Sequence, residues 1–181
     1  MGELSLVEHR APWVVVTKAD DPWVATELAA LRKQHGVVVL LNAGELLEPA
    51  ALFRTFATKL SFPGYFGNNW DALVDSLSDP HVASHGGWGR GGLAVLIDDA
   101  DQLLGAEHLG LFVSVLCQAA WRTNLQLDAD ALAYTEPPFA MHFVLLLDEA
   151  APAEFAAQVG SRNDVKTEMV DGRLTATSID D

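Results

Sequence analysis

Three apolar runs constrain the fold of this chain more than any other feature. They are Val37–Leu41, Leu93–Ile97 and Phe139–Leu147. Short, nearly unbroken apolar runs are typical of strands that are covered on both faces, as in a parallel sheet. Helical patterns separate the runs, so the alternation predicts an α/β fold with a parallel sheet and right-handed crossovers. With 181 residues, the chain can bury a substantial core and is expected to form one domain.

The segments between the runs carry separate helix signals. Pro49 opens an amphipathic stretch that continues to Leu60, and a second helix begins beyond an aromatic loop, near Asn69. Glu107–Trp121 is rich in apolar residues and predicts a helix ahead of the third run. The order β-α-α-β-α-β is therefore expected for the central part of the chain.

Both ends of the chain add elements to this order. Trp13–Thr17 is a short β-rich run, and Trp23–His35 has helical spacing with Asp21 as N-cap and Gly36 as stop.

Two further elements are expected near the C-terminus. Pro152–Val159 fits a short helix with proline in its first turn. Within Val165–Ser178, Asp171 and Gly172 separate two β-prone runs, which predicts a hairpin at the edge of the sheet.

The stretch Phe62–Leu77 joins an aromatic loop directly to a short helix. Pro63 and Gly64 end the preceding helical pattern, and Gly67 tolerates a positive φ, so the loop is expected to bend sharply. The helix is expected to begin at one of the two asparagines that follow, because either side chain can accept a hydrogen bond from an N–H of the first turn.

Helical spacing divides the side chains of this segment into two sets. The apolar stripe consists of Trp70, Leu73, Val74 and Leu77. The acidic edge consists of Asp71, Asp75 and Asp79. Like charges four residues apart destabilise a helix by about 0.2–0.5 kcal/mol per pair, so this edge does not stabilise the helix itself. A merely solvated surface is one explanation, but no Lys or Arg occurs from Leu60 to Gly89. The carboxylates are therefore expected to lack an intrachain cation and to face an external one.

The segment Tyr65–Leu77 reads Tyr-Phe-Gly-Asn-Asn-Trp-Asp-Ala-Leu-Val-Asp-Ser-Leu. It resembles, without gaps, the central loop and helix of the barstar family of intracellular ribonuclease inhibitors. The resemblance implies that four residues face a nuclease, namely Tyr65, Asn69, Asp71 and Asp75. It also implies that Asp75 enters the phosphate-binding active site of that nuclease, and that Phe66 and Trp70 are neighbouring apolar positions.

Two positions depart from the family pattern. Val74 stands where the family has a tryptophan, and Gln118 aligns best with a glutamate that also contacts the enzyme. A weaker pattern match covers residues 37–148 and implies a barstar-like three-layer fold, with a small, mainly parallel sheet flanked by helices. Residues 1–36 would add a strand and a helix, and residues 149–181 a helix and a hairpin.

The net charge of −14 restricts the possible partners. Between Leu60 and Ser161, only Arg90 and Arg122 oppose thirteen acidic residues. Binding to nucleic-acid phosphates is therefore not expected, whereas attraction to a basic protein is. An acidic excess also serves solubility, so the charge alone identifies no partner.

The glycines at positions 87, 89 and 92 have the G-x-G-x-x-G spacing of dinucleotide-binding loops. That motif requires a strand before the glycines, whereas here the apolar run follows them. A flexible connection is expected instead, with Trp88 and Arg90 at its tip, where they could touch a partner.

Metal-binding and catalytic readings have weaker support. His81 and His85 are four residues apart and Asp79 is near, but Pro80 makes a continuous helix doubtful, so no metal site is predicted. The acids after the second apolar run, Asp98, Asp99 and Asp101, keep an α/β enzyme as an alternative, although such clusters often only cap a turn.

Cys117 is the single cysteine and lies among apolar residues, so an ordinary buried thiol is expected. The chain shows neither a signal peptide nor a run of about 20 apolar residues, so a cytoplasmic protein without a membrane span is expected.

These observations predict an intracellular inhibitor, or immunity protein, that binds a basic ribonuclease, for example a toxin, and needs neither catalysis nor cofactor. The predicted partner-binding residues are Tyr65, Phe66, Asn69, Asp71, Asp75, Asp79, Trp88 and Gln118. The alternatives are an interaction module for a basic protein that is not a nuclease, and a carboxylate-dependent or metal-dependent enzyme.

Overall fold

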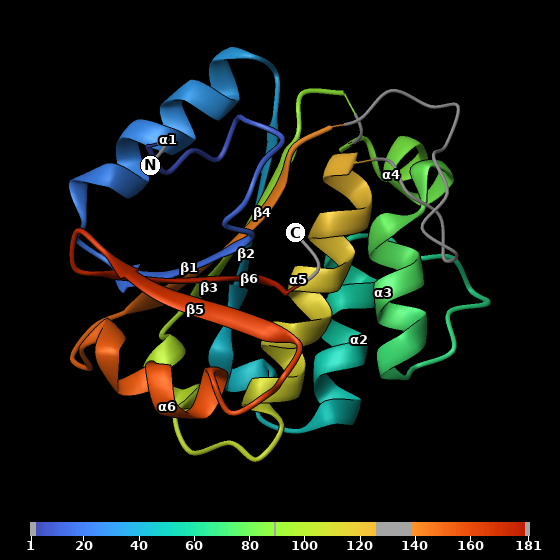
Figure 1. Cartoon of the computed structure of the whole chain (residues 1–181). Helices are drawn as coiled ribbons and strands as arrows, with labels where there is room; N and C mark the ends of the chain where they lie inside the picture. The colour runs from blue at the N-terminus through green and yellow to red at the C-terminus, as the bar shows by residue number, and fades with distance from the viewer. Residues whose placement is uncertain (1–2, 89, 126–138, 180–181) are drawn as a thin grey trace.

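One mixed sheet organises the structure. The computed structural model describes residues 3–88, 90–125 and 139–179, which form a six-stranded sheet (Figure 1). The strands are β1 (Val14–Lys18), β2 (Val37–Asn42), β3 (Leu93–Asp98), β4 (Met141–Leu147), β5 (Val165–Val170) and β6 (Arg173–Ser178). Their order across the sheet is β2-β3-β4-β1-β6-β5.

The pairing directions confirm the predicted, mainly parallel sheet. β2 pairs with β3, β3 with β4, and β4 with β1, all in parallel. β6 runs antiparallel to β1 and to β5, so the C-terminal hairpin extends the edge of the sheet, as expected. The N-terminal strand lies inside the sheet, between the central parallel strands and this hairpin.

Helices cover both faces of the sheet, which confirms the three-layer α/β architecture. They are α1 (Pro22–Lys33), α2 (Pro49–Lys59), α3 (Trp70–Ser78), α4 (Pro80–Gly86), α5 (Leu109–Leu125) and α6 (Ala156–Val159), with 3-10 turns at Ala43–Glu45, Ala100–Leu103 and Pro152–Phe155. Figure 1 shows α1 on one side of the sheet and α2, α3 and α5 on the other.

Helical structure is interrupted at Asp79, where α3 ends, and Pro80 begins the separate helix α4, although a continuous helix over His81 and His85 was not expected. Asp79 acts as the N-cap of α4, because Oδ1 accepts a hydrogen bond from the backbone N–H of His81 at 2.8 Å. Pro80 occupies the first helical position, where a missing N–H costs no hydrogen bond. Gly87, with φ 77°, ends the helix in the left-handed conformation.

The core has two parts, one on each side of the sheet. The larger part contains the edge-to-face pair of Phe56 from α2 and Phe112 from α5, with ring centroids 5.8 Å apart. Cys117 is buried in the same part, as predicted. In the smaller part, Leu28 and Leu31 of α1 pack on the opposite sheet face. None of the helices within the described ranges is long and apolar enough to cross a bilayer.

A partly buried ion pair joins the two chain ends at the start of α1. Asp21 is the predicted N-cap and accepts from the backbone N–H of Trp23 at 3.0 Å. Arg173 on β6 donates to both carboxylate oxygens, at 2.6 and 3.0 Å. The hydrogen bond from Arg173 outweighs burial and, with Thr17 and the cap, lowers the pKa of Asp21 to about 2.

We predict that Asp21→Asn destabilises the protein at pH 7 by about 1–2 kcal/mol, because asparagine keeps the cap but loses the charge. A lowered pKa means that the stabilisation by the carboxylate is complete above the unfolded-state pKa of 3.8 and disappears as the pH falls towards 2. Chemical unfolding of parent and variant between pH 7 and pH 2 measures this difference. A difference in unfolding free energy that stays constant over that range would contradict the assignment.

Candidate partner-binding site

The loop before α3 is bent by residues other than the expected glycine. Ser61 and Asn68 have positive φ values of 55° and 51°, whereas Gly67 does not. The role of Gly67 is close packing, because a Cβ there would lie 3.3 Å from the Cβ of Ala72. Gly67 therefore does not adopt the positive φ that it would tolerate, although the expected sharp bend is present.

This loop sends its two aromatic rings in opposite directions. Tyr65 is 80% exposed. Phe66 is buried against Phe53 and Phe62, with ring centroids 6.5 and 5.0 Å away. Phe66 is thus a core residue, and its prediction as a partner-binding residue is corrected, whereas Tyr65 is free to contact another molecule.

The start of α3 is fixed by Asn69. Its Oδ1 accepts from the backbone N–H of Ala72 at 2.8 Å, and its Nδ2 donates to the Gly67 carbonyl at 3.2 Å. Asp71 lies in the first turn, where the helix dipole favours a negative charge. Asn69 therefore shapes the surface by holding the loop and the helix in one geometry.

The apolar stripe of α3 faces inward as predicted. Leu73, Val74 and Leu77 are buried, and α3 packs closely on α5. Trp70 is partly buried, with its ring centroid 4.9 Å from that of Phe53. The apolar stripe therefore determines which side of α3 remains outside.

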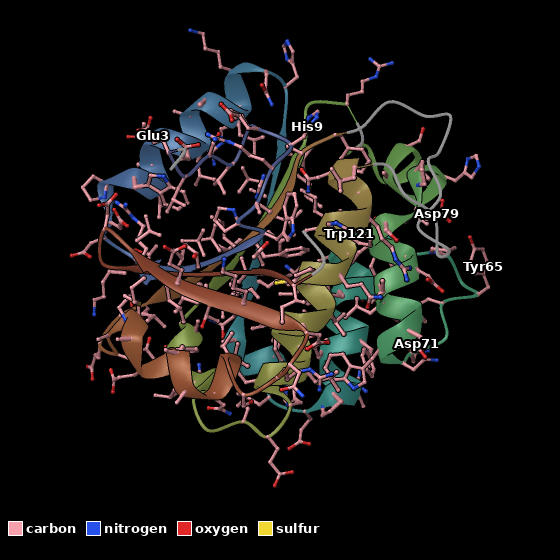
Figure 2. The ribbon with its side chains drawn as sticks, in the orientation of Figure 1. Glu3, His9, Tyr65, Asp71, Asp79 and Trp121 are labelled. Carbon is pink, nitrogen blue, oxygen red and sulfur yellow. The ribbon has the colours of Figure 1, made fainter. Side chains whose placement is uncertain are left out.

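The three acids of the opposite edge differ in their surroundings. Asp71 and Asp75 are exposed, whereas Asp79 is half-buried and uses one oxygen to cap α4. Figure 2 shows Tyr65, Asp71 and Asp79 on the same side of the molecule. The acidic edge thus offers two exposed carboxylates beside an exposed tyrosine.

Asp75 has an intrachain cation, contrary to the expectation from the sequence. Nη1 of Arg122 on α5 donates to Oδ1 of Asp75 at 3.2 Å. Lys and Arg are absent from the sequence around α3, but folding brings α5, and with it Arg122, beside α3. The side chain of Asp75 is nevertheless 67% exposed, against 12% for Arg122. Among the described residues, Oδ2 of Asp75 has no hydrogen-bond or ion-pair partner.

Arg122 is the residue of this surface that sequence reasoning missed. It follows the exposed Gln118 by one helical turn, so both side chains lie on the same side of α5. That spacing is the signal that would have found it, once Gln118 had been placed beside the acidic helix. The surface therefore has carboxylates on α3 and, on α5, one amide and one fixed cation.

Trp88 does not lie at an exposed tip. It is only 2% exposed and packs edge-on against Phe139, with ring centroids 5.8 Å apart. Gly86 is part of the reason, because it lies so close to the indole that a side chain there would clash with it. The prediction of Trp88 as a partner-binding residue is therefore wrong.

His81 and His85 lie on one helix, although a continuous helix was not expected there. Both are exposed on α4 and line a cleft of about 430 Å³ together with Phe62 and Tyr65. The cleft adjoins the acidic edge through Tyr65. Two imidazoles supply only part of a metal coordination sphere.

The described residues contain one group of three side chains with metal-compatible spacing, Asp99, Asp101 and Asp148. Asp101 accepts three backbone N–H groups that follow β4, from Asp148, Glu149 and Ala150, at 2.8, 3.1 and 2.6 Å. Burial opposes the ionisation of Asp101, but these donors outweigh it and lower its pKa. This pattern indicates that Asp101 stabilises the turn after β4, which was the alternative to a catalytic centre given from the sequence.

Fold and surface together define an α/β scaffold with an acidic helix and an exposed tyrosine on one side. A family model described as Barstar (barnase inhibitor) matches residues 37–143, from β2 into β4 and including all of α3 and α5. The match covers more than half of the chain, which therefore belongs to the barstar family. No curated protein shows significant similarity to it.

We predict a weak coupling between Asp75 and Arg122. A double-mutant cycle of Asp75→Asn and Arg122→Gln, followed by chemical unfolding, should give a coupling free energy below about 1 kcal/mol, as is typical of exposed ion pairs. Arg10→Gln is the control, because Arg10 pairs with Glu8 instead. A coupling of several kcal/mol would mean that Asp75 is committed to Arg122 and unavailable to an external cation.

Proposed function

We propose that this protein is an intracellular inhibitor of a basic ribonuclease and blocks the enzyme's active site with helix α3. The carrying observation is the pair of exposed carboxylates, Asp71 and Asp75, beside the exposed Tyr65 on a capped helix of a barstar-family chain. The protein itself carries out no catalysis in this proposal, and its compartment is the cytoplasm.

The chemistry of the surface matches an enzyme that binds RNA phosphates. A ribonuclease active site must hold an anionic phosphate with Arg, Lys or His donors. Carboxylates accept charge-assisted hydrogen bonds from the same donors, so Asp75 and Asp71 would occupy the place of the substrate phosphate. Oδ2 of Asp75, which has no partner among the described residues, is available for such a bond while Oδ1 stays with Arg122.

Tyr65 would supply the apolar part of the interface. A tyrosine ring buries a large area at small entropic cost, and aromatic residues are enriched among the residues that dominate binding energy. Because it projects from a loop held by Asn69 and Phe66, Tyr65 needs little rearrangement to bind. The cleft lined by His81 and His85 lies directly beside it and would receive a neighbouring part of the enzyme.

The departures from the family pattern favour a target other than barnase as the natural enzyme. Val74 is buried against the core and Gln118 is exposed and neutral. Arg122 adds a positive charge to the same surface, so the enzyme would need an acceptor opposite it. The two departures and the added cation also leave a basic protein that is not a nuclease as a second candidate. Capture of a partner without ribonuclease activity would support that candidate.

The proposal is tested by capture followed by an activity assay. Immobilised protein should retain a basic ribonuclease from lysates of its source cells at low salt, and the purified protein should stop RNA cleavage by that enzyme. Barnase is the first purified enzyme to test, since the family description names it. Retention of a partner whose RNA cleavage continues unchanged would contradict the proposed function.

We predict that Asp75→Ala weakens binding to the retained ribonuclease by at least about 2 kcal/mol, the usual threshold of an interface hot spot. Glu168→Ala is the matched control, because it removes an equal charge from the exposed surface of β5. Equilibrium titration of RNA cleavage measures both variants. If Asp75→Ala inhibited fully at the concentrations at which the parent does, the proposal that α3 binds in the active site of the enzyme would be contradicted.

We also predict that raising the salt concentration from about 50 to about 500 mM slows association with the ribonuclease by about tenfold or more, since long-range attraction from the acidic surface is screened over a few ångströms at high salt. The dissociation rate should change much less. Stopped-flow mixing at several salt concentrations measures both rates, and an association rate that is independent of salt would argue against steering by charge.

A further inference from the structure

Strand β2 forms one edge of the sheet and β5 the other. The two edges differ in how they oppose pairing with another chain. β5 carries Lys166 and Glu168, and charged side chains are a common protection of exposed edges. β2 reads Val-Val-Val-Leu-Leu-Asn and contains no charged residue. The β2 edge therefore lacks the protection that β5 has.

The side chains of β2 are unusually accessible for an apolar strand. Those of Val37–Val39 are partly buried, and Leu40 is 54% exposed. The neighbouring β3 and β4 are buried almost throughout. Within the described residues, no strand lies beyond β2 to cover it.

One hydrogen bond shows which backbone groups of β2 face the neighbouring strand and which face away from the sheet. The N–H of Val37 donates to the carbonyl of Gly92, ahead of β3, at 2.8 Å. Because backbone groups alternate along a strand, Val39 and Leu41 also face β3. The N–H and C=O groups of Val38 and Leu40 and the N–H of Asn42 consequently point away from the sheet, in the arrangement that another strand requires. The Asn42 carbonyl instead begins the 3-10 turn that follows the strand.

We propose that β2 is a self-association surface, on which a second copy of this chain pairs its own β2 in the antiparallel direction about a two-fold axis. Among the residues with outward-facing backbone groups, a register centred on Leu40 opposes Leu40 to its own copy and Val38 to Asn42. This register buries the exposed leucine against its equivalent. It joins the two sheets into one continuous sheet.

The charges that flank β2 favour a second copy in this direction. Arg32 and Lys33 lie at the end of α1, shortly before the strand, and Glu45 and Glu48 follow it; all four are exposed. An antiparallel pair brings the basic segment of one copy towards the acidic segment of the other. A parallel pair would instead bring like charges together.

The part of the chain that supplies β2 carries little net charge. Residues 1–59 contain seven acidic and six basic residues, so the part of the chain that supplies β2 is nearly neutral. A single six-residue strand pair is a small interface, which places the dimer among weak, concentration-dependent complexes.

Sedimentation equilibrium of the full chain at neutral pH tests this inference without any partner. The weight-average mass should rise from the monomer value towards twice that value as concentration increases. Leu40→Lys should remain monomeric at every concentration, and because Leu40 is exposed the variant should fold, which circular dichroism checks. A parent that stays monomeric up to millimolar concentration, or a variant that associates as the parent does, would overturn the proposal.

A cysteine placed on the strand tests the register. In an antiparallel pair, directly opposed residues have Cα atoms about 5.5 Å apart, which a disulfide can span. Leu40→Cys should form a covalent dimer under mild oxidation, while the native Cys117 stays buried. Met169→Cys on β5, which replaces a side chain that is 45% exposed, is the control for chance collision. Equal cross-linking of the two variants would exclude a specific β2 pair.

Discussion

The packing of α3 on α5 is the contact on which the acidic surface depends. Leu73 and Leu77 are fully buried in it, and truncating a buried leucine to alanine typically costs about 2–5 kcal/mol. With the apolar stripe held inside, Asp71 and Asp75 have no alternative to the outer side of the helix. The mutual repulsion of neighbouring carboxylates, about 0.2–0.5 kcal/mol per pair, is too small to change that orientation. Burial of the apolar stripe therefore holds Asp71 and Asp75 together on the outer side of α3, although their mutual repulsion slightly destabilises the helix.

The ion pair of Asp75 with Arg122 adds a second constraint from the same packing. It crosses from α3 to α5 and leaves Oδ2 of Asp75 without a partner in the part of the chain that the structure describes. Because Asp75 is largely exposed, the pair contributes little stability, and an arriving cation can share the carboxylate with Arg122 at small cost. The surface is therefore a mixed one, acidic along α3 and with a fixed cation on α5, and its best complement is a cationic cleft with an acceptor at one side.

Local signals in the sequence predicted most of the fold and the outward position of Tyr65, Asp71 and Asp75. Apolar runs predicted the strands, and cap residues such as Asp21 and Asn69 predicted the helix starts, because both depend on neighbours in sequence. The buried Trp88, the capped α4 and the Arg122 contact were not predicted, since each depends on residues that only folding brings together. Phe66 was misassigned for the same reason. A family resemblance indicates which position of the chain corresponds to a family position. Whether the ring of Phe66 points inward depends on its packing against Phe53 and Phe62.

Hydrogen exchange of the chain, free and bound to the ribonuclease that it retains, tests the central claim most directly. The account predicts that protection on binding is concentrated in residues 64–79 and in α5 around Gln118 and Arg122, with little change in the β5–β6 hairpin. Protection elsewhere on the molecule, with α3 and its loop exchanging as in the free protein, would contradict it.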